Sequence, residues 1–148
     1  VEAAAEMLEP YKEPACTVVT HQERVDESTQ LSGVVIAGVD SMAARHAIWK
    51  AVQFNIDVPL YMDGRIGGER AQLFTLNPFD HQAGEFYSQW LFDDSEAAPL
   101  PCAERTVIHP PVVLAGLMIG QLTRFARELP ATPFIDSHLR VPQFVTIN

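Results

Sequence analysis

The sequence predicts an α/β fold in which helices pack on a sheet of mixed strand direction. An unbroken apolar run, LSGVVIAGV at residues 31–39, has the length and β-branched composition of a buried strand. A segment with helical spacing of apolar residues follows it, and then two strand-like runs separated by a short connection. Strand, helix and strand in this order indicate α/β layering, while strands without an intervening helix indicate a mixed sheet. The length of 148 residues suits one domain over 1–148.

The N-terminal part of the chain is expected to supply a helix and two strands. Prolines at positions 10 and 14 end the first helical pattern, and ACTVVTH at residues 15–21 is a short β-branched run typical of a strand. Residues 22–30 are polar and predict a loop or a short surface helix. Because residues 31–39 are apolar throughout, we expect them to form a central strand that is buried on both faces.

The middle of the chain predicts a helix followed by a hairpin. Residues 41–55 place Ala44, Ile48, Ala51 and Val52 at helical spacing. VPLYMD at residues 58–63 and ERAQLFTL at residues 69–76 have strand composition, and the glycine-rich GRIGG lies between them. So short a link indicates neighbouring antiparallel strands.

The C-terminal part predicts a long helix and a final pair of strands. Residues 80–92 fit a helix or an irregular segment, and residues 96–111 form a loop interrupted by prolines. The helix over 112–129 is apolar nearly all round in its first half, so we expect that half to be buried and Arg124 and Arg127 to face water. Within it, Gly116 and Gly120 have the spacing of a close helix contact. Residues 134–147 supply one or two strands.

Composition and charge exclude several function classes. A net charge of −9 and a pI of about 4.8 argue against nucleic acid or an anionic membrane as partner, because both attract a basic surface. Cys16 and Cys102 lie far apart, and no Cys/His cluster has zinc spacing, so we expect neither a disulfide nor a zinc site. The acidic N-terminal stretch lacks the apolar core of a signal peptide, and the apolar run at 112–120 is too short to span a bilayer. We therefore expect a cytoplasmic protein.

The stretch VDSMAAR at residues 39–45 holds the main candidate site residues. Asp40 stands where a buried strand ends and a helix begins, which is where ligands bind in open α/β sheets. A carboxylate there can hold a magnesium ion and, through it, nucleotide phosphates. Arg45, one helical turn further on, could reach a phosphate or a carboxylate. The alternatives are that Asp40 or Ser41 only caps the helix, and that Arg45 lies on a solvated helix face.

Two other features have weaker functional interpretations. GRIGG at residues 64–68 lacks the Lys-Ser/Thr ending and the following helix of a phosphate loop, so we interpret its glycines as serving a turn or bulge. Cys102, in a loop, could be a nucleophilic thiolate or an inert apolar residue. The five histidines are scattered, and we assign none of them to catalysis.

Three segments in order resemble the ThiF/MoeB-like, ubiquitin-activating-enzyme-like adenylyltransferases. VVIAGVDSMAARHAIWKAV at 34–52 resembles the family's strand, Asp and helix, with Arg five residues after the Asp. VPLYMDGRIGGERAQLFTLNP at 58–78 resembles the strand pair that follows in the family. PLPCAERTVIHPPVVLAGLMIGQLTRFAR at 99–127 resembles its Pro-x-Cys-Ala-Glu segment and long helix. The resemblance covers residues 13–128.

The resemblance implies a Rossmann-like domain that binds Mg-ATP. Such proteins adenylate the C-terminal glycine of a ubiquitin-like or sulfur-carrier protein and release pyrophosphate, and many are homodimers. It assigns magnesium and nucleotide binding to Asp40 and support of that site to Arg45, and it places Ser41 at a nucleotide-contacting position that is usually Asn. It also implies that Cys102 lies near the adenylate and can accept the carrier.

Departures from the family pattern set the limits of this expectation. The sequence has no GxGxxG phosphate loop, no following Arg and Lys, and no zinc-binding CxxC pairs. We therefore expect the chain to correspond to the C-terminal half of such a domain, to bind ATP weakly or not at all by itself, and to dimerise through the open edge of strand 31–39. A non-catalytic assembly or binding module on the same fold is the alternative, and a fragment of a Rossmann dehydrogenase is a third interpretation.

Overall fold

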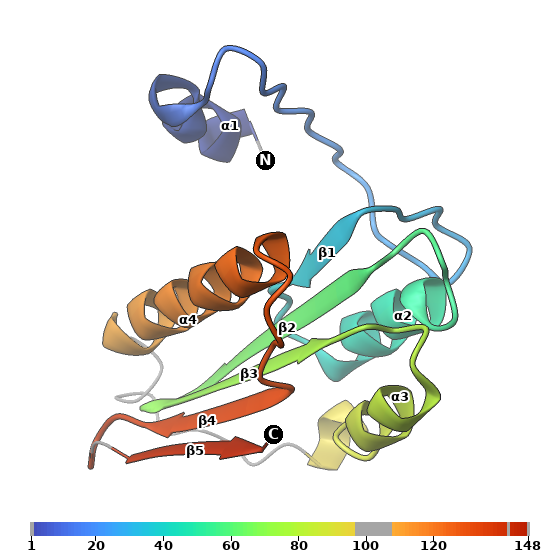
Figure 1. Ribbon diagram of the computed structural model, residues 1–148, viewed down its shortest axis with the longest axis vertical. Helices are drawn as coiled ribbons and strands as arrows, with labels where there is room; N and C mark the ends of the chain where they lie inside the picture. Colours follow the sequence, from blue (N-terminus) through green and yellow to red (C-terminus); the bar gives the residue numbers. More distant parts are fainter. Residues whose placement is uncertain (1, 97–107, 142, 148) are drawn as a thin grey trace.

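The computed structural model describes residues 2–96, 108–141 and 143–147. It shows a five-stranded mixed sheet with α4 on one face and α2 and α3 on the other (Figure 1), which confirms the predicted mixed α/β class. The elements, in chain order, are α1 Glu2–Leu8, the 3-10 turn η1 Glu9–Tyr11, β1 Val34–Ala37, α2 Met42–Val52, β2 Leu60–Gly67, β3 Arg70–Leu76, α3 His81–Ser88, the 3-10 turn η2 Asp94–Glu96, α4 His109–Ala126, β4 Phe134–His138 and β5 Gln143–Ile147.

The sheet keeps the order of the chain, from β1 to β5. β1 runs parallel to β2, and every later neighbour is antiparallel. A parallel pair needs a crossover connection, and α2 provides it between β1 and β2. The carboxyl ends of β1 and β2 therefore lie together at one end of the sheet, and α2 begins there.

The predicted hairpin is confirmed, and its strands are longer than expected. β2 continues through most of the glycine-rich segment, and the turn itself is only Gly68 and Glu69. Gly68 has a φ of 59°, a conformation that glycine adopts at little cost. The hairpin thus places polar residues of both strands side by side, with Arg65 directly opposite Gln72.

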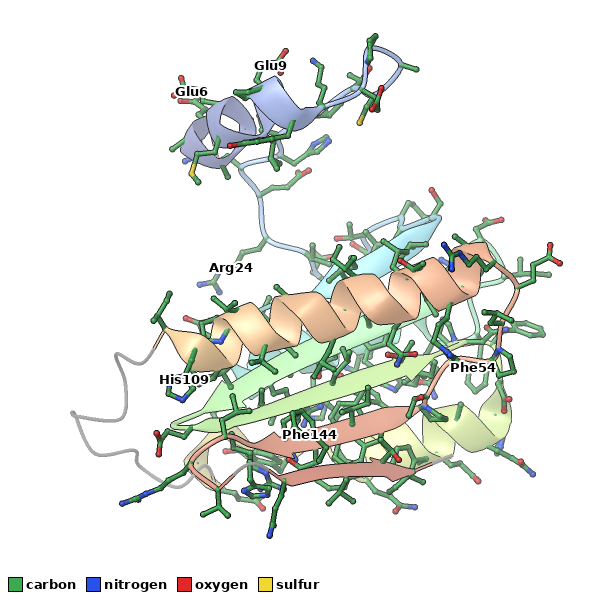
Figure 2. All side chains as sticks on the ribbon, turned by 60° about the vertical axis from the view of Figure 1, so that its left-hand side comes forward. Glu6, Glu9, Arg24, Phe54, His109 and Phe144 are labelled. Atoms are coloured by element: carbon green, nitrogen blue, oxygen red, sulfur yellow. The ribbon has the colours of Figure 1, made fainter. Side chains whose placement is uncertain are left out.

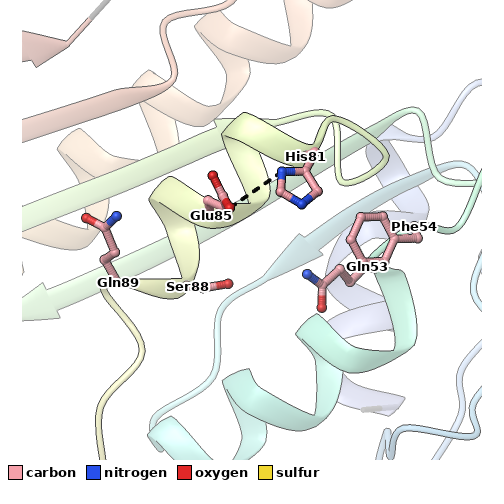
Figure 3. A pocket seen from close by; sticks show the side chains of 6 residues that line it. All are labelled: Gln53, Phe54, His81, Glu85, Ser88 and Gln89. Atoms are coloured by element: carbon pink, nitrogen blue, oxygen red, sulfur yellow. Dashed lines mark ion pairs between the residues drawn. The ribbon is translucent and has the colours of Figure 1, made fainter.

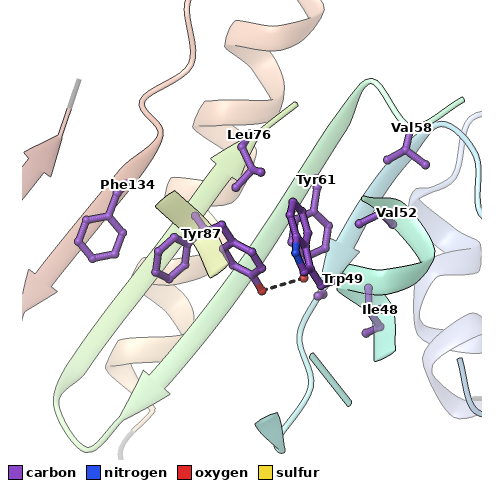
Figure 4. Close-up of a cluster of buried hydrophobic side chains, with 10 residues drawn as sticks. Ile48, Trp49, Val52, Val58, Tyr61, Leu76, Tyr87 and Phe134 are labelled. Carbon is purple, nitrogen blue, oxygen red and sulfur yellow. Dashed lines mark hydrogen bonds between the residues drawn. The ribbon is translucent and has the colours of Figure 1, made fainter. Parts of the chain in front are cut away.

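An aromatic core fills the face of the sheet under α2 and α3 (Figure 4). Trp49 of α2 lies with its ring centroid 4.8 Å from that of Tyr87 of α3. Tyr61 of β2 approaches both rings, and its hydroxyl lies 3.1 Å from that of Tyr87. These large buried rings fix the two helices on the sheet, since each buries much apolar area.

The opposite face of the sheet carries α4, which packs closely on β2 and β3. Leu114 of α4 is buried against an apolar patch of the three central strands, which is made of Leu60, Met62, Ala71, Leu73 and Ile135. The close approach requires a glycine in β2, because a Cβ at Gly64 would lie 2.6 Å from Cε of Met118. The two faces of β2 therefore belong to two separate apolar cores.

Two expectations for the strands are wrong. Residues 15–21 form no strand; they belong to a linker that joins α1 to the sheet, and α1 lies apart from the rest of the fold (Figures 1 and 2). A β-branched run is not a strand without a neighbour to hydrogen-bond. β1 is also not a central strand, since among the described residues it pairs with β2 alone and exposes half of Ile36.

The expectation that the first half of the long helix is buried is also wrong. α4 buries Pro110, Leu114 and Gln121, whereas Val112 and Ile119 are more than half exposed. Cβ atoms added at Gly116 and Gly120 would meet no described atom within 4 Å, so these glycines serve no contact in the described structure. Only the face of α4 that lies over β2 and β3 is covered.

No helix in the described part of the chain is long and apolar enough to cross a membrane.

Candidate functional site

A pocket of about 890 Å³ opens beyond the carboxyl ends of the two parallel strands. Its walls come from the end of β1, the start of α2, the second half of β2, the segment around Trp90 and the first turns of α4. The polar side chains that line it are Asp40, Arg45, Arg65, Arg70, Gln72 and Asp94. In an open α/β sheet this is the general place for a ligand.

Two of the three residues predicted from the VDSMAAR stretch line this pocket. Asp40 is exposed there, while Ser41 has turned its side chain to the helix. The Ser41 hydroxyl accepts a hydrogen bond from the Ala44 backbone N–H at 3.2 Å, which makes it the N-cap of α2. Ser41, rather than Asp40, therefore caps the helix, and the Asp40 carboxylate stays available to a ligand.

Arg45 is buried at the floor of the pocket rather than solvated on a helix face. Its Nε donates to the Asp63 carboxylate at 3.0 Å. Nη1 donates to the Ser41 carbonyl and Nη2 to the Gly64 carbonyl, both at 3.3 Å. All three nitrogen atoms thus have partners within the protein, so Arg45 connects α2 to β2 and contributes its charge to the pocket from below.

A fully buried carboxylate, Asp63 of β2, holds this region together. It accepts hydrogen bonds from Nε of Arg45, Nε of Arg65 and the hydroxyl of Tyr87, at 3.0, 2.7 and 2.9 Å. Burial raises the pKa of Tyr87 above its ordinary value, and the nearby Asp63 charge raises it further, so the hydroxyl keeps its proton and donates. One carboxylate faces two arginines, which leaves one excess positive charge beneath the pocket.

Arg65 is the second buried arginine, and its guanidinium group is held on several sides. Nε bonds Asp63, and Nη1 donates to the Trp90 carbonyl at 2.7 Å. The guanidinium carbon lies 4.5 Å from the centre of the Phe74 ring, a cation–π distance. Nη2 is buried and has no hydrogen-bond partner.

The N-terminus of α2 is occupied by a carboxylate of the same chain. Asp94 accepts hydrogen bonds from the backbone N–H groups of Met42 and Ala43, at 2.6 and 3.1 Å. The unpaired N–H groups at a helix start attract anions, and Asp94 fulfils that role here. The pocket is thus lined by Asp94, which is bound to the start of α2, and by the exposed Asp40.

Arg70 lies on the far side of the pocket, on β3. Its guanidinium binds both carboxylate oxygens of Asp136, with Nε to Oδ1 at 2.8 Å and a second bond from Nη2 to Oδ2. The Arg70 hydrogen bonds lower the pKa of Asp136 and outweigh the effect of its burial. Almost half of the Arg70 side chain is exposed, and Arg70 forms part of the pocket wall.

Sequence reasoning missed the residues that organise the pocket. Asp63 ends a predicted strand, whereas Arg65 was assigned to the glycine-rich link. Because β2 continues through Gly67, the period of two places both residues on one face of the sheet. Asp94 gave no signal, because it meets α2 only through folding. Cys102 lies outside the described residues.

Neither a metal cluster nor the second pocket adds a site. Over residues 2–96, 108–141 and 143–147, no three His, Cys, Asp or Glu side chains come together as metal ligands. A pocket of about 400 Å³ lies between α2 and α3, where His81 and Glu85 form an exposed ion pair at 3.6 Å (Figure 3). Its lining holds no buried charge, so chemistry is better placed at the larger pocket.

A scan against models of known protein families and a search of curated proteins gave no match to this chain. Function is therefore inferred from the pocket and from the order of the sequence motifs.

Proposed function

We propose that this chain belongs to an adenylyltransferase that activates the C-terminus of a ubiquitin-like or sulfur-carrier protein with ATP. In this proposal, the parallel β1 and β2 with α2 between them are part of a Rossmann-like nucleotide domain. The observation that supports it best is that Asp40 and Arg45, the two residues singled out by the family resemblance, line one pocket beyond the carboxyl ends of parallel strands.

The charges around the pocket suit a magnesium nucleotide and a carboxylate substrate. Asp40 is exposed, and a second carboxylate, Asp94, lines the same pocket. Magnesium usually binds one or two carboxylates together with phosphate oxygens. The excess positive charge of Arg45 and Arg65 over Asp63 lies beneath the same pocket and would stabilise negative charge that develops at phosphorus. Asp40 would thus hold the metal ion, and the arginines would supply fixed charge.

Residues 1–148 lack one part of such a site. A glycine-rich loop whose backbone N–H groups hold the phosphates is absent from the sequence, and Asp94 already occupies the amides of α2. We therefore expect this stretch by itself to bind Mg-ATP weakly. Micromolar affinity that Asp40→Ala abolishes would contradict this expectation.

The proposed function is tested by ATP–pyrophosphate exchange in the natural protein that contains these residues. Exchange should depend on the carrier protein and on magnesium. Asp40→Asn should lower it by about a hundredfold or more, since a metal ligand contributes several kcal/mol to stabilising the transition state. Asp57→Asn is the matched control, because Asp57 is exposed near the amino end of β2 and away from the pocket. Equal rates for the two variants would refute the role of Asp40.

A non-catalytic assembly module remains the second candidate, and one observation favours it. Apolar side chains of β1 and α4 are exposed, namely Val34, Ile36, Val112 and Ile119. Such side chains are often covered by another chain. A protein that dimerises but shows neither pyrophosphate exchange nor Asp40-dependent nucleotide binding would fit this candidate. A monomer at high concentration in light scattering would count against it.

A further inference from the structure

Two buried nitrogen atoms without acceptors lie in the wall of the large pocket. They are Nη2 of Arg65 and Nε2 of Gln72, and both residues line the pocket. The residues are direct cross-strand partners on β2 and β3, so their side chains lie on the same face of the sheet. Among the buried side-chain nitrogen atoms of the described residues, only these two lack a hydrogen-bond partner.

Buried donors of this kind are uncommon in folded proteins, because an unpaired buried polar group is costly. Arg65 is 8 % exposed, and its other two nitrogen atoms are bonded to Asp63 and to the Trp90 carbonyl. The guanidinium therefore cannot turn to find another partner without breaking one of these bonds. Gln72 lies opposite Asp136 on β4 and helps to lower the pKa of that carboxyl, so its Nε2 is near a carboxylate, although the contact lacks the geometry of a hydrogen bond.

Most of the other donors around the pocket are already engaged within the protein. Arg45 uses all three nitrogen atoms within the protein, and the first amides of α2 bind Asp94. Arg70 is bound to Asp136 through Nε and Nη2, and its remaining donor, Nη1, belongs to a side chain that is 45 % exposed and can bond water. The buried donors that still lack an acceptor in this pocket are therefore those of the Arg65–Gln72 pair.

We infer that Arg65 and Gln72 together bind an anionic group with two acceptor oxygens, one to each free nitrogen. This inference rests on the proposed function, which offers two sources of such a group: a phosphate of the nucleotide or the terminal carboxylate of the acyl substrate. It assigns the anion contact to Arg65 rather than to Arg45. Asp63, the Trp90 carbonyl and the Phe74 ring hold the guanidinium in position for that contact.

The two nitrogen atoms are covered from solvent although their residues line the pocket. A ligand oxygen therefore reaches them only when a neighbouring side chain of the pocket moves. The side chains of Trp90 and Phe92, which also line the pocket, belong to the segment just before Asp94. We expect binding of the anion to change the fluorescence of Trp90.

The experiment measures anion binding by calorimetry on the full chain with two kinds of probe. One probe is inorganic pyrophosphate with and without magnesium, and the other is a short peptide that ends in Gly-Gly with a free carboxylate. The same peptide with a C-terminal amide shows whether the carboxylate is needed. These arms distinguish a phosphate from a carboxylate as the natural ligand.

The variants are Arg65→Lys and Gln72→Met. Arg65→Lys keeps the positive charge beside Asp63, and Gln72→Met keeps the approximate size of the side chain. Each should weaken binding of the preferred probe about tenfold, because each removes a hydrogen bond to a charged group. Matched controls are Arg124→Lys in α4 and Gln143→Met in β5, because both residues are exposed. These two variants should bind the probe as the unmodified chain does. If Arg65→Lys does not fold, Gln72→Met still decides, because its side chain forms no hydrogen bond through Nε2.

Three results would each overturn the inference. The first is no binding of either probe at millimolar concentration, and the second is that both variants bind the probe as tightly as the unmodified chain does. The third is equal binding of the free and the amidated peptide when pyrophosphate does not bind. The inference and the proposed function can fail separately. Arg65-dependent anion binding would leave the inference standing, while missing pyrophosphate exchange in the natural protein that contains these residues would refute the function. Pyrophosphate exchange that Arg65→Lys leaves unchanged would do the reverse.

Discussion

Replacing Asp63 with Asn tests whether the buried carboxylate organises the pocket. Asp63 is 0 % exposed and is the one carboxylate that Arg45 and Arg65 share. Asn has nearly the same shape but no charge, and its amide N–H₂ would point toward a guanidinium that can only donate. Both arginines would then be buried without a counter-charge. Breaking a buried pair by removing one partner costs about 3–5 kcal/mol, so we expect the free energy of unfolding to fall by that amount.

The loss is measured by urea unfolding, followed through tryptophan fluorescence and circular dichroism. For a chain of this size, about 3–5 kcal/mol corresponds to a fall in Tm of roughly 6–20 °C. Asp136→Asn is the matched control, because Asp136 is also buried but pairs with an arginine whose side chain is 45 % exposed. Without the carboxylate Arg70 would still be hydrated, so the control should cost clearly less than Asp63→Asn.

A loss below about 1 kcal/mol for Asp63→Asn, or one equal to the loss for Asp136→Asn, would refute the reasoning, because the buried charges would then not depend on Asp63. A double variant sharpens the test. Arg65→Met should cost less in the Asp63→Asn background than in the unmodified chain, because one uncompensated charge would be removed with it.

The other three predictions concern two separate glycines, Gly64 and Gly116, and the response of the Arg70–Asp136 pair to pH. Gly64→Ala should lower the free energy of unfolding by about 1–3 kcal/mol, because its Cβ would lie 2.6 Å from Cε of Met118 and 2.9 Å from Cδ2 of Leu114. Gly116→Ala should raise it by up to about 1 kcal/mol, because no described atom lies near the new methyl group and alanine favours the helix; a loss instead would indicate that another chain packs there. Hydrogen bonds from Arg70 lower the pKa of Asp136, so this pair stabilises the fold above pH ~4, where unfolded carboxyls ionise, and its contribution is lost as the pH falls through the lowered pKa. The difference in unfolding free energy between the unmodified chain and Asp136→Asn should therefore shrink between pH 7 and pH 2, and a difference that grows would contradict this cause.

The spacing of apolar residues predicts a helix or strand correctly where the same residues also form the core of the folded protein. α2 and the β2–β3 hairpin were predicted because their apolar spacing is the same spacing that the core uses. The strand expected at residues 15–21 failed, because β-branched residues fit a strand only when a neighbouring strand is present. α4 was expected to be buried from its composition, which does not specify how many of its faces meet a partner.

The site shows the same division between local and tertiary information. Asp40 and Arg45 could be found because they lie in one short stretch at the junction of a strand and a helix. The bonds that determine their roles come from elsewhere in the chain: Asp63 from β2, and Asp94 from the segment after α3. No spacing rule connects positions 45 and 63, or 42 and 94, because folding alone brings them together.

These long-range contacts also explain why Arg45 and Arg65 differ although both bind Asp63. Arg45 reaches Asp63 from a helix whose own carbonyl, at Ser41, accepts one of its nitrogen atoms, and Gly64 accepts the other. Arg65 lies on the strand itself and extends along the sheet to the Trp90 carbonyl, so that its last nitrogen atom has no acceptor. Each arginine carries the same charge, but only Arg65 retains a free donor. The electrostatic role of the pair can therefore be shared, while the specific contact to a ligand oxygen falls to Arg65, and removal of Asp63 should impair both roles at once.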